Sequence, residues 1–302
     1  MELNELLGIG DFTLVEESYA NQKWIGRTLE YLRKVEEADV AEAIRIVAES
    51  GDRELMGTAV YDRGLGFWIV FTDVIADMRS KEEFEALAGE IKGDKEQVVE
   101  VAREKLREAV IEFYSIGLVN RLFCDCDLRD ASFYPRERTV ALKKVLDDFL
   151  TGIEEKGNAL EIGCGNGGAT IALHESGIFP IAVDINKCEI CKGIEEGILE
   201  PKRSIVLDCA HLSAFFSREF DVVFGFMIGK LTPGTMFEWE RVLREVHRVL
   251  RDRGHVLFTV SSEEEAEMVK ELLKAEFVGE IKENAGSDGY LDHWVYAGAR
   301  RG

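Results

Sequence analysis

Apolar residues in the first part of the chain recur mainly at the spacing of an amphipathic helix. Two such stripes comprise Trp24, Leu29, Leu32 and Val35, and then Val99, Ala102, Leu106, Val110 and Phe113. Polar clusters such as GDRE and KGDKE separate the apolar stretches and are typical of loops. The pattern predicts a mainly helical N-terminal region over residues 1–137.

From residue 138 the pattern alternates between amphipathic helices and short apolar runs. Residues 138–150 form one such helix, whose apolar face comprises Leu142, Val145, Leu146 and Phe149. The runs of strand length that follow are NALEIG, FPIAVDI, SIVLD, FDVVFGFM and GHVLFTV. This alternation predicts an α/β fold over residues 138–302, with a doubly wound, mostly parallel sheet and helices on both faces.

The chain ends on a different pattern. Two strand-like segments, EFVGEIKEN and YLDHWVYAGA, are joined by a glycine-containing turn that leaves no room for a helix. We therefore expect these segments to form an antiparallel hairpin.

The composition indicates a folded chain and disfavours one class of partner. The chain has 302 residues, of which 46% are hydrophobic and 4 are proline, which favours two globular domains over disorder. Its net charge is −21, from 37 Lys and Arg against 58 Asp and Glu. Such a charge repels phosphate backbones, so nucleic acid is a disfavoured substrate.

The sequence also favours a cytoplasmic location. The first residues lack the cationic start and apolar core of a signal peptide. The most apolar stretch, LGFWIVFTDVIADM, is interrupted by Asp73 and Asp77 and is too short to cross a bilayer. We expect no membrane contact, and we expect the 6 cysteines to be reduced thiols rather than a disulfide framework.

The segment LEIGCGNGG, residues 160–168, carries the sharpest chemical signal. A strand delivers Glu161, a loop follows with Gly163, Gly165 and Gly167, and a helix begins near residue 169. Glycines allow a tight turn and let a ligand press against bare backbone, while a helix start offers free N–H groups. The segment predicts a binding site for a nucleotide-like cofactor.

Two further acidic residues end the next predicted strands. Asp184 closes IAVD, where a carboxylate can accept hydrogen bonds from both ribose hydroxyls, and Asp208 closes SIVLD, where it can reach an adenine amino group. The carboxyl ends of parallel strands meet at one edge of the sheet, which is where open α/β sheets bind ligands.

The glycines alone leave two cofactor classes open. Gly163, Gly165 and Gly168 also fit the dinucleotide pattern G-x-G-x-x-G, which indicates a nicotinamide or flavin site. Three features favour a sulfonium cofactor instead. Glu161 stands where dinucleotide folds usually have an apolar residue, a carboxylate there attracts a cation but repels a pyrophosphate, and the terminal hairpin is foreign to a dinucleotide-binding half.

Taken together, residues 158–298 resemble the class I S-adenosylmethionine-dependent methyltransferase family. ALEIGCGNG resembles its first motif, AVDIN its second, VLDCAHL its third, FDVVFGFM its fourth and REVHRVLRDRGHVLFTV its fifth-strand segment. Asp252 and Arg253 replace the family's usual proline-glycine pair. The resemblance implies a seven-stranded sheet with an antiparallel last strand.

The resemblance also implies roles for individual residues. Glu161 and the Gly163–Gly167 backbone would hold the methionine end of S-adenosylmethionine, and Asp184 would bind its ribose. Ile185 would pack on the adenine, whose edge Asp208 and the Cys209 backbone would read. The N-terminal region would be a cap that binds the acceptor, which we expect to be a small molecule or a protein.

No residue stands out as a catalytic base. Methyl transfer from a sulfonium is an in-line displacement, so alignment and desolvation supply most of the rate. His211 and His293 lie nearest the expected site, but ordinary structural roles are favoured for both. In YPRERT, Arg136 could reach the cofactor, although a surface ion pair is the favoured interpretation.

Four cysteines form two short motifs. Cys124 and Cys126 make C-x-C, and Cys188 and Cys191 make C-x-x-C, so together they could offer four thiolates to zinc or an iron–sulfur cluster. Because Cys188 and Cys191 fall in the first turn of a predicted helix, where small apolar residues suit packing, we assign no metal site.

Three functional hypotheses follow. The favoured one is a methyltransferase that uses S-adenosylmethionine. The second is a nicotinamide- or flavin-dependent oxidoreductase, and the third is a non-catalytic module that retains the cofactor pocket but regulates a partner.

Overall fold

The structure is a computed structural model that divides into two compact units, residues 1–123 and 124–302. It describes residues 2–16, 25–35, 39–49, 53–74, 76, 78–122, 126, 134–153 and 157–301. The division falls earlier than the predicted boundary at residues 137 and 138. Of the helices described, none is both long and apolar enough to cross a membrane.

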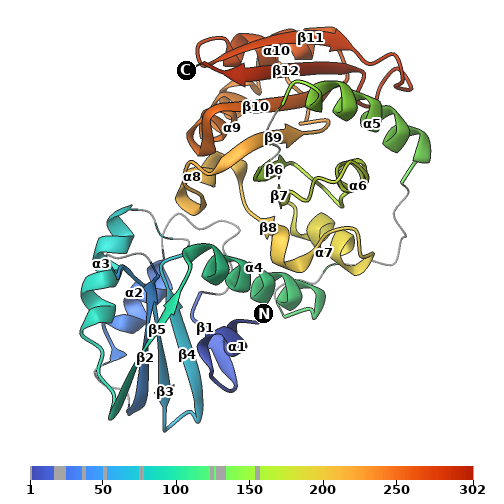
Figure 1. Cartoon of the computed structure of the whole chain (residues 1–302). Helices are drawn as coiled ribbons and strands as arrows, with labels where there is room; N and C mark the ends of the chain where they lie inside the picture. Colours follow the sequence, from blue (N-terminus) through green and yellow to red (C-terminus); the bar gives the residue numbers. More distant parts are fainter. Residues whose placement is uncertain are drawn as a thin grey trace. The chain divides into compact units, whose positions relative to one another are not determined.

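The N-terminal unit is built on a five-stranded sheet with the strand order β1-β4-β3-β2-β5 (Figure 1). Strands β2, β3 and β4 form an antiparallel meander, while β1 pairs with β4 and β5 pairs with β2 in parallel. The strands are β1 (Phe12–Leu14), β2 (Val40–Ala48), β3 (Leu55–Asp62), β4 (Phe67–Thr72) and β5 (Lys95–Val101). The helices are α1 (Leu3–Leu7), α2 (Gly26–Leu32), α3 (Met78–Gly89) and α4 (Arg103–Val119).

The sheet corrects the expectation that this region is mainly helical. The stripe from Val99 to Phe113 crosses a boundary, because Val99 lies in β5 whereas Leu106 and Val110 lie in α4. Strand β3 is buried at seven of its eight positions, so its sequence lacks the alternation of a half-exposed strand. The other stripe corresponds to α2, with Trp24 outside the described residues.

The C-terminal unit contains the expected seven-stranded sheet, with the order β11-β12-β10-β9-β6-β7-β8. All neighbouring pairs are parallel except those of β12, which is antiparallel to both β10 and β11. The strands are β6 (Ala159–Ile162), β7 (Ile181–Asp184), β8 (Ser204–Val206), β9 (Phe220–Gly225), β10 (Leu250–Val260), β11 (Phe277–Glu283) and β12 (Trp294–Arg300).

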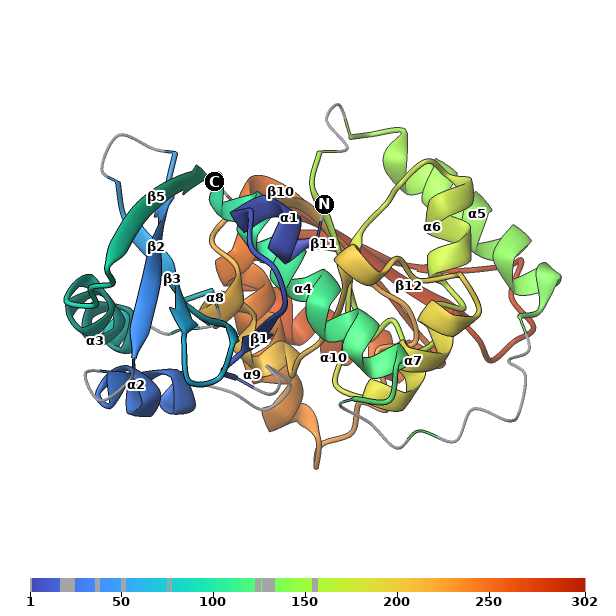
Figure 2. The ribbon, with the colours of Figure 1, turned by 90° about the horizontal axis from the view of Figure 1, so that it is seen from below.

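Helices cover both faces of this sheet (Figures 1 and 2). On one face, Leu142 and Leu146 of α5 and Leu173 of α6 pack with Phe224 and Leu257 of the central strands. On the other, α10 lies against β10, β11 and β12 and contacts α9. The helices are α5 (Arg136–Leu150), α6 (Thr170–Glu175), α7 (Lys187–Glu195), α8 (Leu212–Phe215), α9 (Met236–Val249) and α10 (Glu263–Leu273), with short 3-10 turns η2 (Pro201–Arg203) and η3 (Cys209–His211).

The segment that lacks proline-glycine forms an irregularity in β10. Pairing with β9 is interrupted between Leu250 and His255, and Arg253 adopts a positive φ of 62°. That backbone region favours glycine, so the arginine that stands in place of the family's glycine has a strained backbone.

The strand order and directions confirm the doubly wound topology and its antiparallel β11–β12 hairpin.

Candidate functional site

The glycine loop joins β6 to α6 through backbone that favours glycine. Gly163, Gly165 and Gly167 have φ values of 65°, 55° and 88°, which side chains with a Cβ rarely adopt. A Cβ built on Gly163 or Gly165 would meet no atom within 4 Å, whereas one on Gly167 would lie 2.7 Å from the side chain of Ile198. The first two glycines therefore face open space, and the third packs the loop onto the chain beyond α7.

Glu161 lies directly beneath this loop, with no exposure to solvent. Its Oε2 accepts a hydrogen bond from Thr170 Oγ1 at 2.7 Å, while Oε1 has no partner among the described residues. Burial raises the pKa of this carboxyl to about 8, against the opposing effects of Thr170 and Arg138. A buried, half-satisfied carboxyl favours a cationic ligand, because a positive charge would offset its desolvation.

Asp184 ends β7 and ties the loop to the next helix. Its Oδ2 accepts a hydrogen bond from the Gly165 N–H at 2.8 Å, and its Oδ1 accepts one from the Asn186 N–H at 2.7 Å. The following residue, Ile185, is 59% exposed. An exposed apolar side chain thus lies next to the carboxylate, and a flat apolar ligand can pack on such a surface.

Asp208 and Cys209 follow β8 at the same edge of the sheet. Asp208 Oδ1 accepts a hydrogen bond from the Ala210 N–H at 2.8 Å and begins the turn η3. Burial raises the pKa of the Cys209 thiol to about 12, and the thiol lies beside the backbone of Gly163. Because β6, β7 and β8 are adjacent and parallel, the structure brings Glu161, Asp184 and Asp208 to one edge.

This arrangement coincides with a family match. A profile of the family described as a methyltransferase domain matches residues 160–258, from the start of the glycine loop segment to β10. The matched segment contains Glu161, Asp184 and Asp208 and runs from β6 to β10 of the C-terminal unit. This match supports a class I S-adenosylmethionine-dependent methyltransferase domain in the C-terminal unit.

Solved structures similar to this chain include proteins from three prokaryotes. A protein of Pyrococcus horikoshii OT3 is 22% identical, over 58% of this chain and 93% of its own, with a TM-score of 0.42. A 1,6-didemethyltoxoflavin-N1-methyltransferase of Burkholderia thailandensis is 19% identical over 54% and 79%, at 0.41. A magnesium protoporphyrin IX methyltransferase of Synechocystis PCC 6803 is 13% identical over 65% and 97%, at 0.42. No curated protein sequence matches the chain.

The methyltransferase domain also contains a polar group that sequence reasoning missed. Arg138 of α5 donates from Nε to Asp292 Oδ2 at 2.7 Å, and Asp292 Oδ1 accepts a hydrogen bond from Thr259. Arg138 is close enough to Glu161 to oppose the rise in the pKa of that carboxyl. YPRERT contains two candidate arginines, and Arg136 instead forms an exposed ion pair with Glu175. The sequence offers no signal that distinguishes them.

The backbone that follows β9 is strained. Met227 has a φ of 51°, and Gly229, two residues later, has a φ of 99°. The Met227 N–H donates to Thr259 Oγ1 at 2.8 Å, which links this loop to Asp292. A hydrogen-bonded network therefore connects α5, β10 and this loop.

The two histidines nearest the site have structural partners. His211 Nε2 lies 3.9 Å from Asp208 Oδ2. His293 Nδ1 pairs with Ser287 Oγ at 2.8 Å, and its Nε2 lies 3.7 Å from Glu283. Neither contact identifies a catalytic base.

Of the four motif cysteines, the structure brings two sulfur atoms together. Cys126 Sγ and Cys188 Sγ lie 2.7 Å apart, and Cys124 lies outside the described residues. Within the described part of the chain, no group of three or more histidine, cysteine or acidic side chains is placed to hold a metal ion.

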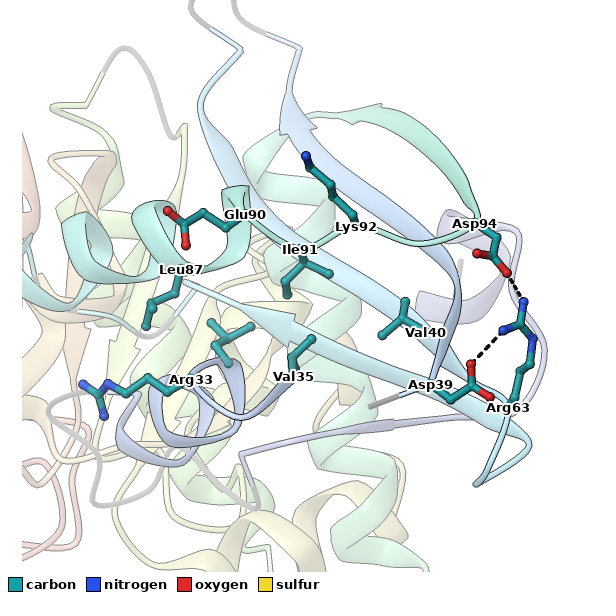
Figure 3. A pocket seen from close by; sticks show the side chains of 11 residues that line it. Arg33, Val35, Asp39, Val40, Arg63, Leu87, Glu90, Ile91, Lys92 and Asp94 are labelled. Carbon is teal, nitrogen blue, oxygen red and sulfur yellow. Dashed lines mark hydrogen bonds and ion pairs between the residues drawn. The ribbon is translucent and has the colours of Figure 1, made fainter. Parts of the chain in front are cut away.

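The N-terminal unit has a cavity of its own, with a volume of about 520 Å³. Figure 3 shows Leu87, Ile91 and Val40 among the side chains that line it, and Arg63 between Asp39 and Asp94. Arg63 pairs with Asp39 at 2.7 Å and also with Asp94, and Arg33, which also lines the cavity, pairs with Glu83. Both arginines thus have acidic partners, whereas Oε1 of Glu161 has no hydrogen-bond partner among the described residues.

Proposed function

We propose that this chain transfers a methyl group from S-adenosylmethionine to a small-molecule or protein acceptor. One observation carries the proposal. A carboxylate oxygen of Glu161 is fully buried and has no partner among the described residues, directly beneath glycines whose backbone faces open space. The ammonium group of S-adenosylmethionine would donate a hydrogen bond to this oxygen, and its positive charge would stabilise the ionised carboxyl.

The other groups at this edge fit the rest of the cofactor. The Gly163–Gly167 backbone would support its methionine end, and Asp184 retains lone pairs to accept from the ribose hydroxyls. The exposed side chain of Ile185 would pack on the adenine, and Asp208 with the Cys209 N–H would bind its edge. S-adenosylmethionine, when bound, supplies an activated methyl group on a sulfonium.

The same charges disfavour the oxidoreductase alternative. Glu161, Asp184 and Asp208 carry up to three negative charges at one edge of the sheet, and a dinucleotide would bring its pyrophosphate into their field. The same field would attract a sulfonium cofactor. The net charge of −21 keeps nucleic acid disfavoured.

The protein's contribution to catalysis would be alignment and exclusion of water. The network from Arg138 through Asp292 and Thr259 to Met227 would hold the loop after β9 in its strained conformation. The N-terminal region would bind and select the acceptor, as a unit with its own sheet and core. A non-catalytic module would bind the cofactor equally well, so turnover separates these two functions.

Calorimetric titration of the full chain tests the cofactor. We expect saturable micromolar binding of S-adenosylmethionine and S-adenosylhomocysteine, with no binding of NAD as the control. Binding of NAD alone would indicate a nicotinamide-dependent oxidoreductase instead. Failure to bind any of the three would contradict the proposal.

A further inference from the structure

Two cysteine motifs far apart in the sequence meet in the C-terminal unit. The sulfur atoms of Cys126, which precedes α5, and Cys188, which lies in the first turn of α7, are 2.7 Å apart. A disulfide bond requires about 2.0 Å between sulfurs, so a small side-chain adjustment would join them. Cys126 is buried and Cys188 is half-buried, so an external reagent reaches Cys188 first.

The surroundings favour redox chemistry over metal binding. A structural thiolate site needs about four donors around one ion, and the described residues contain no group of even three suitable side chains. Cys191, one turn further along α7, is fully buried. The described sulfur–sulfur contact joins one thiol from each motif, and two neighbouring thiols have the composition of a dithiol couple.

We propose that Cys126 and Cys188 form a reversible dithiol–disulfide couple that tunes the cofactor site. The oxidant would be a small-molecule disulfide such as oxidised glutathione. The Cys188 thiolate attacks one of its sulfurs and expels a thiolate; the Cys126 thiolate then attacks Cys188 Sγ and expels the second. Two protein thiols lose two protons and two electrons, and the small disulfide becomes two thiols.

Cys188 is linked to the cofactor site by short hydrogen bonds. Its N–H donates to the Asn186 side chain at 3.1 Å, and the Asn186 N–H donates to Asp184. Asp184 in turn accepts from the Gly165 N–H. A bond between residues 126 and 188 would also close a ring of chain that contains β6, the glycine loop and β7.

Oxidation would thus restrain the elements that present the loop and Asp184. Because pre-ordering a site reduces the entropy lost on binding, we expect the disulfide form to bind S-adenosylmethionine about three- to tenfold more tightly. This effect on affinity rests on the proposed function, whereas formation of the disulfide does not.

The test uses the full chain, reduced, desalted and then exposed to oxidised glutathione. Peptide mapping should find residues 126 and 188 cross-linked with the loss of two hydrogens. The midpoint of thermal unfolding should rise by about 5–10 °C and return on reduction. Cys126→Ala and Cys188→Ala should abolish both changes, and the matched control Cys191→Ala should retain them.

Several outcomes would overturn the couple. These are persistent glutathione on Cys188 without a cross-link, thiols that remain unmodified, or a stoichiometric metal ion in the purified chain that is released only when Cys126 or Cys188 is replaced. A cross-link with unchanged affinity for S-adenosylmethionine would disprove the tuning of the site. A cross-link in a chain that binds no S-adenosylmethionine in either state would leave the couple intact and refute the proposed function instead.

Discussion

Asp73 in the N-terminal unit and Glu161 in the C-terminal unit are acidic side chains with exposures of 2% and 0%. Burial raises the pKa of both carboxyls. Asp73, however, lies 3.4 Å from Arg103 and 4.0 Å from Lys81, whereas Glu161 has one hydroxyl partner and an oxygen without one among the described residues.

The two carboxyls differ in whether their polar partners are already present. This difference distinguishes a structural carboxyl from one that binds a ligand. Asp73 already has two cations nearby that partly offset its desolvation, so it has less need of a cationic ligand. Glu161 has no ion-pair partner among the described residues, although Arg138 opposes the rise in its pKa, so a bound cation would offset the remaining cost of its burial. A buried acid is therefore a functional candidate when its partners are missing, rather than because it is buried.

Replacement of Asp73 should have the largest effect on stability. Arg103 is half-buried and pairs with both Asp73 and Glu54. Asp73→Ala removes the buried partner and leaves Glu54, so we expect a loss of about 3 kcal/mol in unfolding free energy. Urea denaturation measures it. The matched control is Glu83→Ala, whose ion pair with Arg33 is exposed on both sides and should contribute less than about 1 kcal/mol. Equal losses would remove the distinction between the two carboxyls.

Replacement of Asp184 should have the largest effect on ligand binding. Asp184→Ala removes charge-assisted hydrogen bonds to the ribose and frees the Gly165 N–H, so affinity for S-adenosylmethionine should fall by about 1–3 kcal/mol. Calorimetry provides the measurement. Asp221→Ala is the control, because Asp221 pairs with Arg251 near the amino end of β9 and should leave affinity unchanged. An unaltered affinity in the Asp184 variant would refute its assignment.

The strand-end acids could be predicted because local sequence determines their positions. Each lies at or near the end of a short apolar run, and parallel neighbours bring such ends together, so the sequence predicts Glu161, Asp184 and Asp208 at one edge, as the structure has them. Their binding roles remain predictions. The same logic predicted the β11–β12 hairpin, whose two segments are adjacent in sequence.

The features that were missed depend on contacts between distant residues. The stripe from Val99 to Phe113 keeps its spacing across the junction of β5 and α4, so periodicity cannot reveal the change. The pairs Arg138–Asp292 and Cys126–Cys188 join segments that the sequence separates by more than 60 residues. Composition near either partner gives no indication of the other.

Glu161→Gln tests whether the buried carboxyl at the site binds the cofactor. The amide keeps the shape of the side chain but cannot become negative, so at pH 8 we expect about a tenfold loss of affinity for S-adenosylmethionine with little loss of stability. The control is Glu245→Gln. Glu245 is also buried, but Ser213 and Arg248 satisfy it, so its variant should lose stability and keep its affinity. The reverse pattern would mean that Glu161 is structural.

The smallest effect is a pH dependence that follows from the pKa of about 8 for Glu161. In the unliganded protein this carboxyl is mostly protonated at pH 7, and folding stability that it contributes by holding the proton is lost as the pH rises from its ordinary range through 8. A bound cation favours the ionised form. Affinity for S-adenosylmethionine should therefore rise about fivefold between pH 7 and pH 8, with nearly one proton released per ligand at pH 7. Titrations in buffers of different ionisation enthalpy count that proton. Glu161→Gln should abolish both the rise in affinity and the release of the proton, because its amide side chain has no acidic proton to lose. If the variant kept both, the proton would come from another group, and Glu161 would be a structural carboxyl like Asp73.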